Sequence, residues 1–494
     1  MVSPSLRRRR FPGVRDDLRA PLYGAVYAVQ RSRAAVPAPL RRRGAVSGCR
    51  GCPSRPRAGT AMVPRVLLTY RQIHLQKRPY GVGPVSAAAI GPCARASRRC
   101  PVTDRPIGLD EYPIHQVPLS MRHVATGDRN AYDRCIFHVL DHTGRALLIA
   151  GLGVYPNTGV IDAYATLRLG DRLHAVRASD ALGDDRLALT VGPLSITVDR
   201  PLERLRLRCD ADPADPGGLS YDLEWHAAFP AVWEPHHTQY RGGRLTLEGR
   251  RFVQAGTCTG TVRAAGTELA VTAGEWTGTR DRSWGVRPIP GEDGGRAAEE
   301  ARPEGFHWIW CPVRFDDRFV MVIVQEDADG HRTLNEALLV RDGVPDVQLG
   351  WPYADITYRA GTRQPERAVL HLTDPARKPL ELAAEILTSS PLAVGAGYPP
   401  ADDWQHGTWR GRGWTDRRTY DLGDPAAHPL AAYGVTDHAA RFTLEGRTGY
   451  GIFEHGSFGR HDPSGFTGYG DTAPARPAAP RPRPTTTQPR EDRS

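Results

Sequence analysis

The side chains best suited to chemistry in this sequence are three carboxylic acids and one phenol. They are Asp281, Glu336, Tyr450 and Glu454. A carboxylic acid in an apolar pocket has a raised pKa, because burial disfavours its charged form, and it can then donate a proton at neutral pH. These residues are therefore candidates for acid–base catalysis that needs no cofactor.

Tryptophans are the candidates for contact with a ligand: Trp225, Trp233, Trp284, Trp308 and Trp310. Trp308 and Trp310 are two residues apart, so on a strand both would lie on the same face. Large aromatic side chains in a β-barrel either pack in the core or line an apolar ligand cavity. The sequence leaves both interpretations open.

The motifs of several common enzyme classes are missing. There is no GxxxxGK[ST] loop for phosphates and no HExxH zinc motif. Gly151–Gly153 begins like a dinucleotide loop, but Tyr155 and Pro156 follow and no helix pattern opens. His455–Gly459 has His455 where a nucleophile elbow needs glycine. His236 and His237 would point to opposite faces of a strand. We therefore expect neither a cofactor nor a metal.

The net charge of +10 comes from one end of the chain. Residues 1–100 contain 21 basic and 2 acidic residues, whereas residues 101–470 contain 39 basic and 50 acidic ones. The acidic body offers no basic face for phosphates, so we expect no nucleic-acid partner. No apolar run reaches 18 residues, so we expect no integral membrane association. The expected partner is an apolar small molecule, and the composition does not indicate an oligomeric state.

Residues 1–101 are predicted to be a disordered extension, because their arginine, proline and glycine content cannot support an apolar core. A translation start placed too far upstream is the favoured explanation, and a transit peptide and a nucleic-acid-binding arm are the alternatives. Residues 471–494 are predicted to be a disordered tail. Cys49 and Cys52 form a CxxC without a second pair at zinc spacing.

The cysteines of the body are Cys135, Cys209, Cys258 and Cys311. They are far apart and lie mostly in apolar segments, which is typical of buried free thiols. Free thiols indicate a reducing compartment, and no signal peptide is visible, so we expect a cytoplasmic protein.

The body is predicted to be all-β. Short segments of alternating or β-branched residues recur between Gly and Asp turns, as in a sandwich or barrel. Asp329-Gly330 predicts a hairpin between residues 320–324 and 334–340. The length favours two antiparallel β-barrels in tandem. We place the first at residues 102–290, a Gly-, Pro- and charge-rich linker at 291–304, and the second at 305–470.

Three segments carry a family resemblance: Gly278–Gly285 (GTRDRSWG), Gly151–Ala165 and Gly449–Glu454. The first resembles the Asp-His-x-Trp signature of the carotenoid 1,2-hydratase and AttH-like superfamily, and the second resembles the opening strands of its actinobacterial members. The resemblance implies two lipocalin-like barrels in tandem. It also implies chemistry such as hydration of terpenoid or prenyl double bonds, or guidance of cycloadditions.

The signature departs from the family pattern at one position. Arg282 stands where hydratases of this group usually have His, and arginine stays protonated, so it is a poor general acid. Asp281 is therefore either a catalytic residue or part of a structural ion-pair site with Arg280 and Arg282.

Two function classes follow from these observations. The first is binding of an isoprenoid, lipid or polyketide-like molecule in a lipocalin-like cavity. The second is a cofactor-independent hydratase, isomerase or cyclase acting on such a ligand. A carboxyl group inside the ligand pocket would favour the enzyme, and a pocket without one would favour binding alone. An interaction module is a third, less favoured class.

Overall fold

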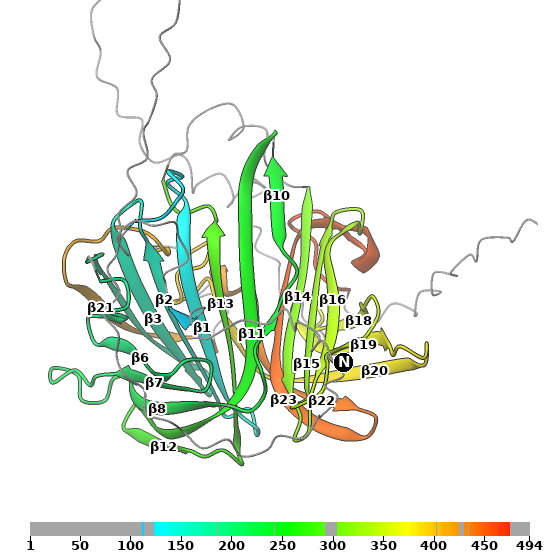
Figure 1. Ribbon diagram of the computed structural model, residues 1–494, viewed down its shortest axis with the longest axis horizontal. Coiled ribbons are helices and arrows are strands. Elements are labelled where there is room, and N and C mark those ends of the chain that lie inside the picture. Colours follow the sequence, from blue (N-terminus) through cyan, green and yellow to red (C-terminus); the bar gives the residue numbers. More distant parts are fainter. Residues whose placement is uncertain are drawn as a thin grey trace, which may run out of the picture. The chain divides into compact units, whose positions relative to one another are not determined.

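The computed structural model describes residues 111–112, 123–183, 185–241, 243–291, 304–401, 403–423, 429–432 and 434–474. The predicted extension 1–101, most of the predicted linker and the tail beyond residue 474 lie outside these residues. The chain from Val102 onward forms one compact unit, and it is almost entirely β (Figure 1).

Fourteen strands form the first sheet, in the order β21-β4-β3-β2-β1-β13-β11-β8-β7-β6-β5, with β9, β10 and β12 also paired to β11. Their bounds are β1 (Ala131–Asp141), β2 (Ala146–Tyr155), β3 (Val160–Leu169), β4 (Arg172–Ala181), β5 (Thr190–Val191), β6 (Leu194–Arg200), β7 (Arg204–Cys209), β8 (Ser220–Ala227), β9 (Val232–Trp233), β10 (His237–Arg241), β11 (Arg244–Ala264), β12 (Thr267–Val271), β13 (Trp276–Val286) and β21 (Trp414–Asp421).

Ten strands form the second sheet, in the order β17-β16-β15-β14-β23-β22-β20-β19-β18, with β24 paired to β23. Their bounds are β14 (Gly305–Arg314), β15 (Phe319–Asp327), β16 (Arg332–Val340), β17 (Val347–Gln348), β18 (Tyr353–Tyr358), β19 (Pro365–Thr373), β20 (Pro379–Pro391), β22 (Thr436–Leu444), β23 (Arg447–His461) and β24 (Phe466–Thr467). Two short 3-10 turns are η3 (Pro429–Ala432) and η4 (Asp462–Ser464).

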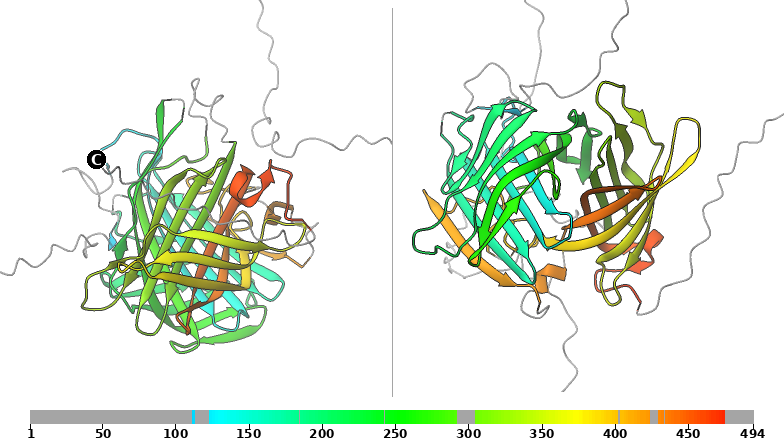
Figure 2. Two further views of the ribbon diagram at one scale, coloured as in Figure 1. Left: turned by 90° about the vertical axis from the view of Figure 1, so that its right-hand side faces the viewer. Right: turned by 90° about the horizontal axis from the view of Figure 1, so that it is seen from below.

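Each sheet curls around its own apolar core (Figure 2). The first core contains Phe137 and Trp225, and the second core contains Ile309 and Phe453. Strand β7 has the pattern of a sheet with one solvent-exposed face. Its arginines are exposed and its apolar residues are buried, in strict alternation. The prediction of an all-β fold with two tandem antiparallel barrels is confirmed.

A third apolar cluster, the middle core, lies between the two sheets. In β1, Phe137 belongs to the first core whereas its neighbour Ile136 belongs to the middle core. In β14, Ile309 belongs to the second core whereas Trp308 belongs to the middle core. Nearly every residue of β1 is therefore buried, as expected for a strand covered on both faces.

Strand β21 joins the two parts of the chain. It follows β20 of the second sheet but pairs antiparallel with β4 at the edge of the first sheet. The buried guanidinium of Arg177 on β4 holds this segment through Asp416 of β21 and through Asp403, 2.6 Å away. The predicted domain ranges stay a prediction, but the sheets do not divide at one sequence boundary.

Two further expectations can be compared with the structure. The Asp329-Gly330 hairpin is confirmed, because β15 pairs with β16 across it and Gly330 has the positive φ of 87° that the turn needs. Within the part of the chain that the structure describes, no helix has the length and apolar character needed to span a membrane.

Candidate functional site

A cavity of about 190 Å³ lies between the two sheets. The first sheet contributes Ile136, Arg251 and Asp281 to its wall, and the second sheet contributes Trp308 and Glu454. These residues come from β1, β11, β13, β14 and β23, so the cavity depends on the packing of the two sheets against each other.

The sequence predicts a lipocalin-like ligand cavity, and the cavity described here lies between the two sheets. The inside of the first curled sheet is filled by its core, including the fully buried Trp225, and a void of only about 10 Å³ lies there. Such a void holds about one water molecule. Of these two spaces, the one between the sheets is the one that can hold an organic ligand.

Asp281 is the first of two carboxyl groups in the cavity wall. Its register partner Ile136 belongs to the middle core, so Asp281 faces the second sheet. Burial raises its pKa to about 7, with help from the nearby Glu234 and Glu454, although Arg251 opposes the shift. A carboxyl group with this pKa is present in both protonation states at neutral pH and can give or take a proton.

Glu454 is the second carboxyl group, and it is coupled to Asp437. The two residues are register partners on β23 and β22, and their side chains are hydrogen-bonded. Burial and the proximity of the two acids raise the pKa of Glu454, and burial raises that of Asp437. Because two ionised carboxylates in hydrogen-bond contact would repel each other, the two carboxyl groups share a proton.

His138 connects this acid pair to the first sheet. Its Nε2 lies 2.9 Å from Asp437 Oδ2, and its Nδ1 lies 3.2 Å from Thr279 Oγ1. Burial lowers the pKa of His138 to about 4, so the ring is neutral at pH 7. Because the ring is neutral, its contact with Asp437 is a hydrogen bond and not an ion pair. Asp437 and Glu454 therefore keep the proton that they share.

Two tryptophans orient the acids. The indole Nε1 of Trp308 donates to Glu454, and that of Trp310 donates to Glu234 Oε1 at 2.5 Å. Arg251 lies 3.3 Å from Glu234 and stacks near the Trp308 ring. Burial raises the pKa of Glu234, whereas Arg251 and Trp310 lower it. The wall is thus a mixture of aromatic, acidic and basic groups and less apolar than the sequence suggests.

The structure brings together three of the nine residues singled out from the sequence. Asp281, Glu454 and Trp308 line the cavity, and Trp310 lies behind it in the middle core. The others lie elsewhere. Trp225 belongs to the first core, and Trp233 and Trp284 form an edge-to-face pair with ring centres 5.7 Å apart. Tyr450 stacks on His142 with ring centres 3.8 Å apart, and Glu336 is hydrogen-bonded to Gln348. Their functional assignment stays a prediction.

The proposed ion-pair site of Asp281 with its two arginine neighbours does not describe this structure. Arg282 points to the opposite face of β13 and bonds Asp133 at 3.0 Å. Arg280 also points inward, where it contacts Glu111 at 2.5 Å and the Trp225 ring at 4.7 Å. Both arginines pack inside the first sheet, and neither of them lines the cavity.

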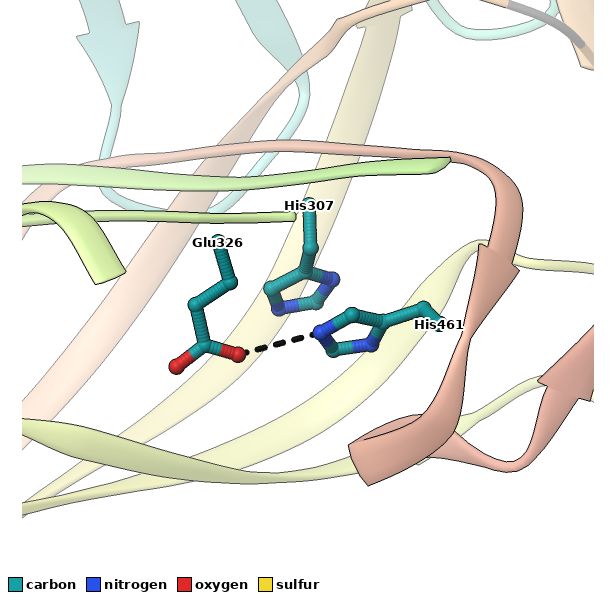
Figure 3. A group of neighbouring side chains, drawn as sticks. All are labelled: His307, Glu326 and His461. Carbon is teal, nitrogen blue, oxygen red and sulfur yellow. Dashed lines mark hydrogen bonds and ion pairs between the residues drawn. The ribbon is translucent and has the colours of Figure 1, made fainter. Parts of the chain in front are cut away.

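Three side chains at one end of the second sheet have the composition of a metal site: His307, Glu326 and His461 (Figure 3). The His307 and His461 rings are stacked 4.1 Å apart with an angle of 4° between their planes. Their nitrogen lone pairs lie in parallel planes, so they do not converge on one ion. His461 is instead satisfied by Glu326 at 3.0 Å and Ser464 at 2.8 Å. Glu326, His461 and Ser464 thus form a hydrogen-bonded chain, and His307 packs against it with its Nδ1 buried and without a hydrogen-bond partner among the described residues.

Sequence reasoning missed Asp437, His138 and Arg251. The segment Thr436-Asp437-His438 did carry a signal, because two ionisable residues stand at buried positions of a strand whose other charged residue, Arg441, is exposed. Their partner His138 is 299 residues away in the sequence. Pairing of residues so distant follows from the packing of the sheets, which no local pattern reports.

Comparisons with known proteins complete the description. A family model described as "Family of unknown function (DUF8625)" matches residues 107–467. No curated protein matches the chain.

Three solved structures are similar in fold. A proposed AttH from Nitrosomonas europaea is 15% identical with a TM-score of 0.43, and the match covers 67% of this chain and 94% of that one. Kievitone hydratase from Nectria haematococca is 14% identical with a TM-score of 0.41, covering 72% and 93%. CghA is 14% identical with a TM-score of 0.38, covering 68% and 89%. At such scores, similarity carries no argument about activity.

Proposed function

Because this chain belongs to DUF8625, a family of unknown function, we propose its activity from the cavity itself: cofactor-independent acid–base catalysis on a small organic ligand. The reaction type is the addition, removal or migration of a proton at an unsaturated or enolisable carbon, as in a hydratase, isomerase or cyclase. The observation that carries the proposal is a pair of carboxyl groups, Asp281 and Glu454, in one cavity with pKa values near neutrality.

The two acids would take different roles. Glu454 shares a proton with Asp437 and is held by the Trp308 indole, so it is the proton donor. Asp281 has its pKa at about 7 and lies beside Arg251, which stabilises the carboxylate form, so it is the proton acceptor or the group that orients water. In acid–base pairs, the surroundings typically favour the protonated form of one group and the ionised form of the other, as they do here for Glu454 and Asp281.

The ring of Trp308 and the apolar residues of the middle core would hold the ligand and limit its contact with bulk water. Arg251 would stabilise negative charge that develops when a proton leaves the ligand, since a fixed charge acts strongly where water is excluded. No step of this chemistry requires a group that the chain does not itself carry.

Binding alone is the second candidate function, and the aromatic part of the cavity wall favours it. A binding protein has no need of protonated acids in its pocket, and burying them costs folding free energy. The raised pKa values of three carboxyl groups, those of Asp281, Asp437 and Glu454, are what favours the enzyme.

A hydrogen-exchange assay tests the proposal. The full chain is incubated in D₂O with a panel of small enolisable and α,β-unsaturated compounds, and deuterium incorporation is measured by mass spectrometry. We expect exchange above the uncatalysed rate for at least one compound, and loss of that exchange in Asp281→Asn and Glu454→Gln. The control Glu385→Gln removes an exposed carboxylate paired with Arg441 and should keep the rate. Binding without exchange across the panel would leave binding as the function.

A further inference from the structure

We propose that Arg134 and Arg287 form an anion subsite in the cavity, so that the ligand is a small unsaturated organic anion, of which a carboxylate is the simplest. The inference rests on the proposed function where it calls this ligand a substrate, but the subsite itself is a binding property. Both arginines line the cavity together with the acids.

Among the residues that the structure describes, Arg134 on β1 has no carboxylate partner within ion-pair distance. Its guanidinium lies 5.5 Å from the Tyr132 ring centre and 5.1 Å from that of Tyr155, and its Nε is buried without a hydrogen-bond acceptor. The acid whose charge acts on Arg134 is Asp162, and its oxygens already accept from His406 Nδ1 at 3.2 Å and from the Gly407 N–H at 2.7 Å. A cation held between aromatic rings with an unused donor is prepared for an anion.

Arg287 follows directly after β13, and its backbone N–H donates to Asn130 at 3.0 Å. Its guanidinium lies 5.8 Å from the Tyr398 ring centre. Among the described residues, neither Arg287 nor Arg134 has a carboxylate within ion-pair distance, whereas Arg251 in the same wall is paired with Glu234. Within the described part of the chain, the two guanidinium groups therefore have no ion-pair partner, and Asp162 acts on Arg134 only from beyond ion-pair distance.

Tyr398 lines the cavity together with the arginines and the acids. The charges of Arg287 and Arg134 lower the pKa of its hydroxyl, whereas those of Asp281 and Glu454 raise it, so it interacts with both groups. A ligand whose charged group contacts the arginines would therefore share this cavity with the acids. The Tyr398 hydroxyl stays protonated, because burial raises its pKa to about 12, and it can donate to the ligand.

The balance of charge in the wall agrees with an anionic ligand. Four arginines and three carboxylic acids line the cavity. The arginines outnumber the acids, and burial raises the pKa of each acid, so the wall is net positive. The pKa of His237 agrees with a positive wall. Burial lowers it most, the charges of Arg251 and Arg287 lower it further, and it reaches about 3. A cavity of about 190 Å³ exceeds the roughly 150 Å³ that accommodates benzene, so a ring with a short charged side chain fits.

Matched probes test the subsite without knowledge of the natural ligand. The affinities of the full chain for trans-cinnamate and for uncharged trans-cinnamamide are measured by titration calorimetry, with benzoate and benzamide as a smaller pair. We expect each anion to bind about tenfold or more tightly than its amide, because a hydrogen bond to a charged group outweighs one to a neutral group by this amount. Arg134→Gln and Arg287→Gln should each remove this preference and leave the affinity for the amide unchanged.

Three controls make the outcome decisive. Arg208→Gln removes an exposed arginine paired with Asp210 at 2.7 Å and should change neither affinity. Asp281→Asn should keep the preference for the anion, so loss of exchange chemistry and loss of anion binding can be told apart. Equal affinity for anion and amide, equal loss of both in the arginine variants, or no saturable binding of either anion up to millimolar concentration would overturn the inference.

Discussion

Asp281 and Arg282 are neighbours on β13 whose side chains lie in different environments: Asp281 faces the cavity between the sheets, and Arg282 bonds Asp133 inside the first sheet at 3.0 Å. Because adjacent residues of a strand point to opposite faces, the arginine does not neutralise the aspartate. The carboxyl group of Asp281 is thus left in a partly desolvated wall, which is the main cause of its raised pKa.

The raised pKa of Asp281 predicts a pH-dependent stability. A carboxyl group whose pKa rises from 3.8 to about 7 on folding stabilises the protein at low pH, and this contribution is lost as the pH rises through 7. We expect Asp281→Asn to flatten the fall in unfolding free energy between pH 5 and pH 8 by about 2–3 kcal/mol. Denaturant titrations at several pH values measure it.

The control for this prediction is Asp222→Asn. Asp222 bonds exposed Arg206, which lowers its pKa below the ordinary value, so its titration is complete below pH 5. Its replacement should leave the slope between pH 5 and pH 8 unchanged. If the unfolding free energy of Asp281→Asn falls with pH as steeply as that of the wild type, the pKa of Asp281 is not raised to about 7.

The proton shared by Asp437 and Glu454 should be visible in the infrared spectrum. At pH 7 we expect a band of a protonated carboxylic acid that Glu454→Gln reduces. Asp437→Asn should shift the titration of Glu454 to lower pH, because it removes the neighbouring charge that raises the pKa of Glu454. Asp355→Asn, at an exposed site paired with His371, should leave the band intact. A wild-type spectrum without this band at pH 7 would contradict the shared proton.

The buried pair of Arg280 and Glu111 should be necessary for stability. Both side chains are almost completely buried, and Glu111 also accepts from the Leu202 N–H at 2.8 Å. Removing one partner leaves a buried charge, so Glu111→Gln should lower the unfolding free energy by about 3–5 kcal/mol. The exposed pair of Arg206 and Asp222 provides the comparison, since Arg206→Gln should cost less than about 1 kcal/mol.

Truncation tests the same contact together with the sequence-based expectation for residues 1–101. A chain that starts at residue 102 keeps Glu111. Its free energy of unfolding should differ from that of the full chain by no more than about 1–2 kcal/mol. A chain that starts at residue 123 lacks Glu111 and should be destabilised about as much as Glu111→Gln. A large loss in the longer of the two chains would show that residues 1–101 contribute to the fold.

The part of this structure that sequence predicts is the part determined by local pattern. Alternating burial and turn residues indicate the strands, as the Asp329-Gly330 hairpin illustrates. Residue type alone was enough to propose Asp281 and Glu454. The sequence could not predict that Asp281 and Glu454 line the same cavity, because their strands, β13 and β23, meet only where the two curled sheets pack together. The pairing of His138 with Asp437 and of β21 with β4 depends on that packing.

Strand β21 leads to the last prediction, because the segment before it contributes Tyr398 and His406 to the cavity wall. This segment is held against β4 by Arg177, whose side chain is only 2% exposed and contacts Asp403 and Asp416. Arg177→Gln should remove the buried cation of this cluster, while Arg418 still pairs with Asp403 and Asp416, and destabilise the protein by about 1.5–3 kcal/mol. Below the unfolding temperature it should also weaken cinnamate binding, since Tyr398 loses its support. Arg441→Gln, which removes an exposed pair with Glu385, should change neither quantity. If Arg177→Gln lowers stability while cinnamate affinity stays at the wild-type value, the residue 398–406 segment is positioned without the help of β21.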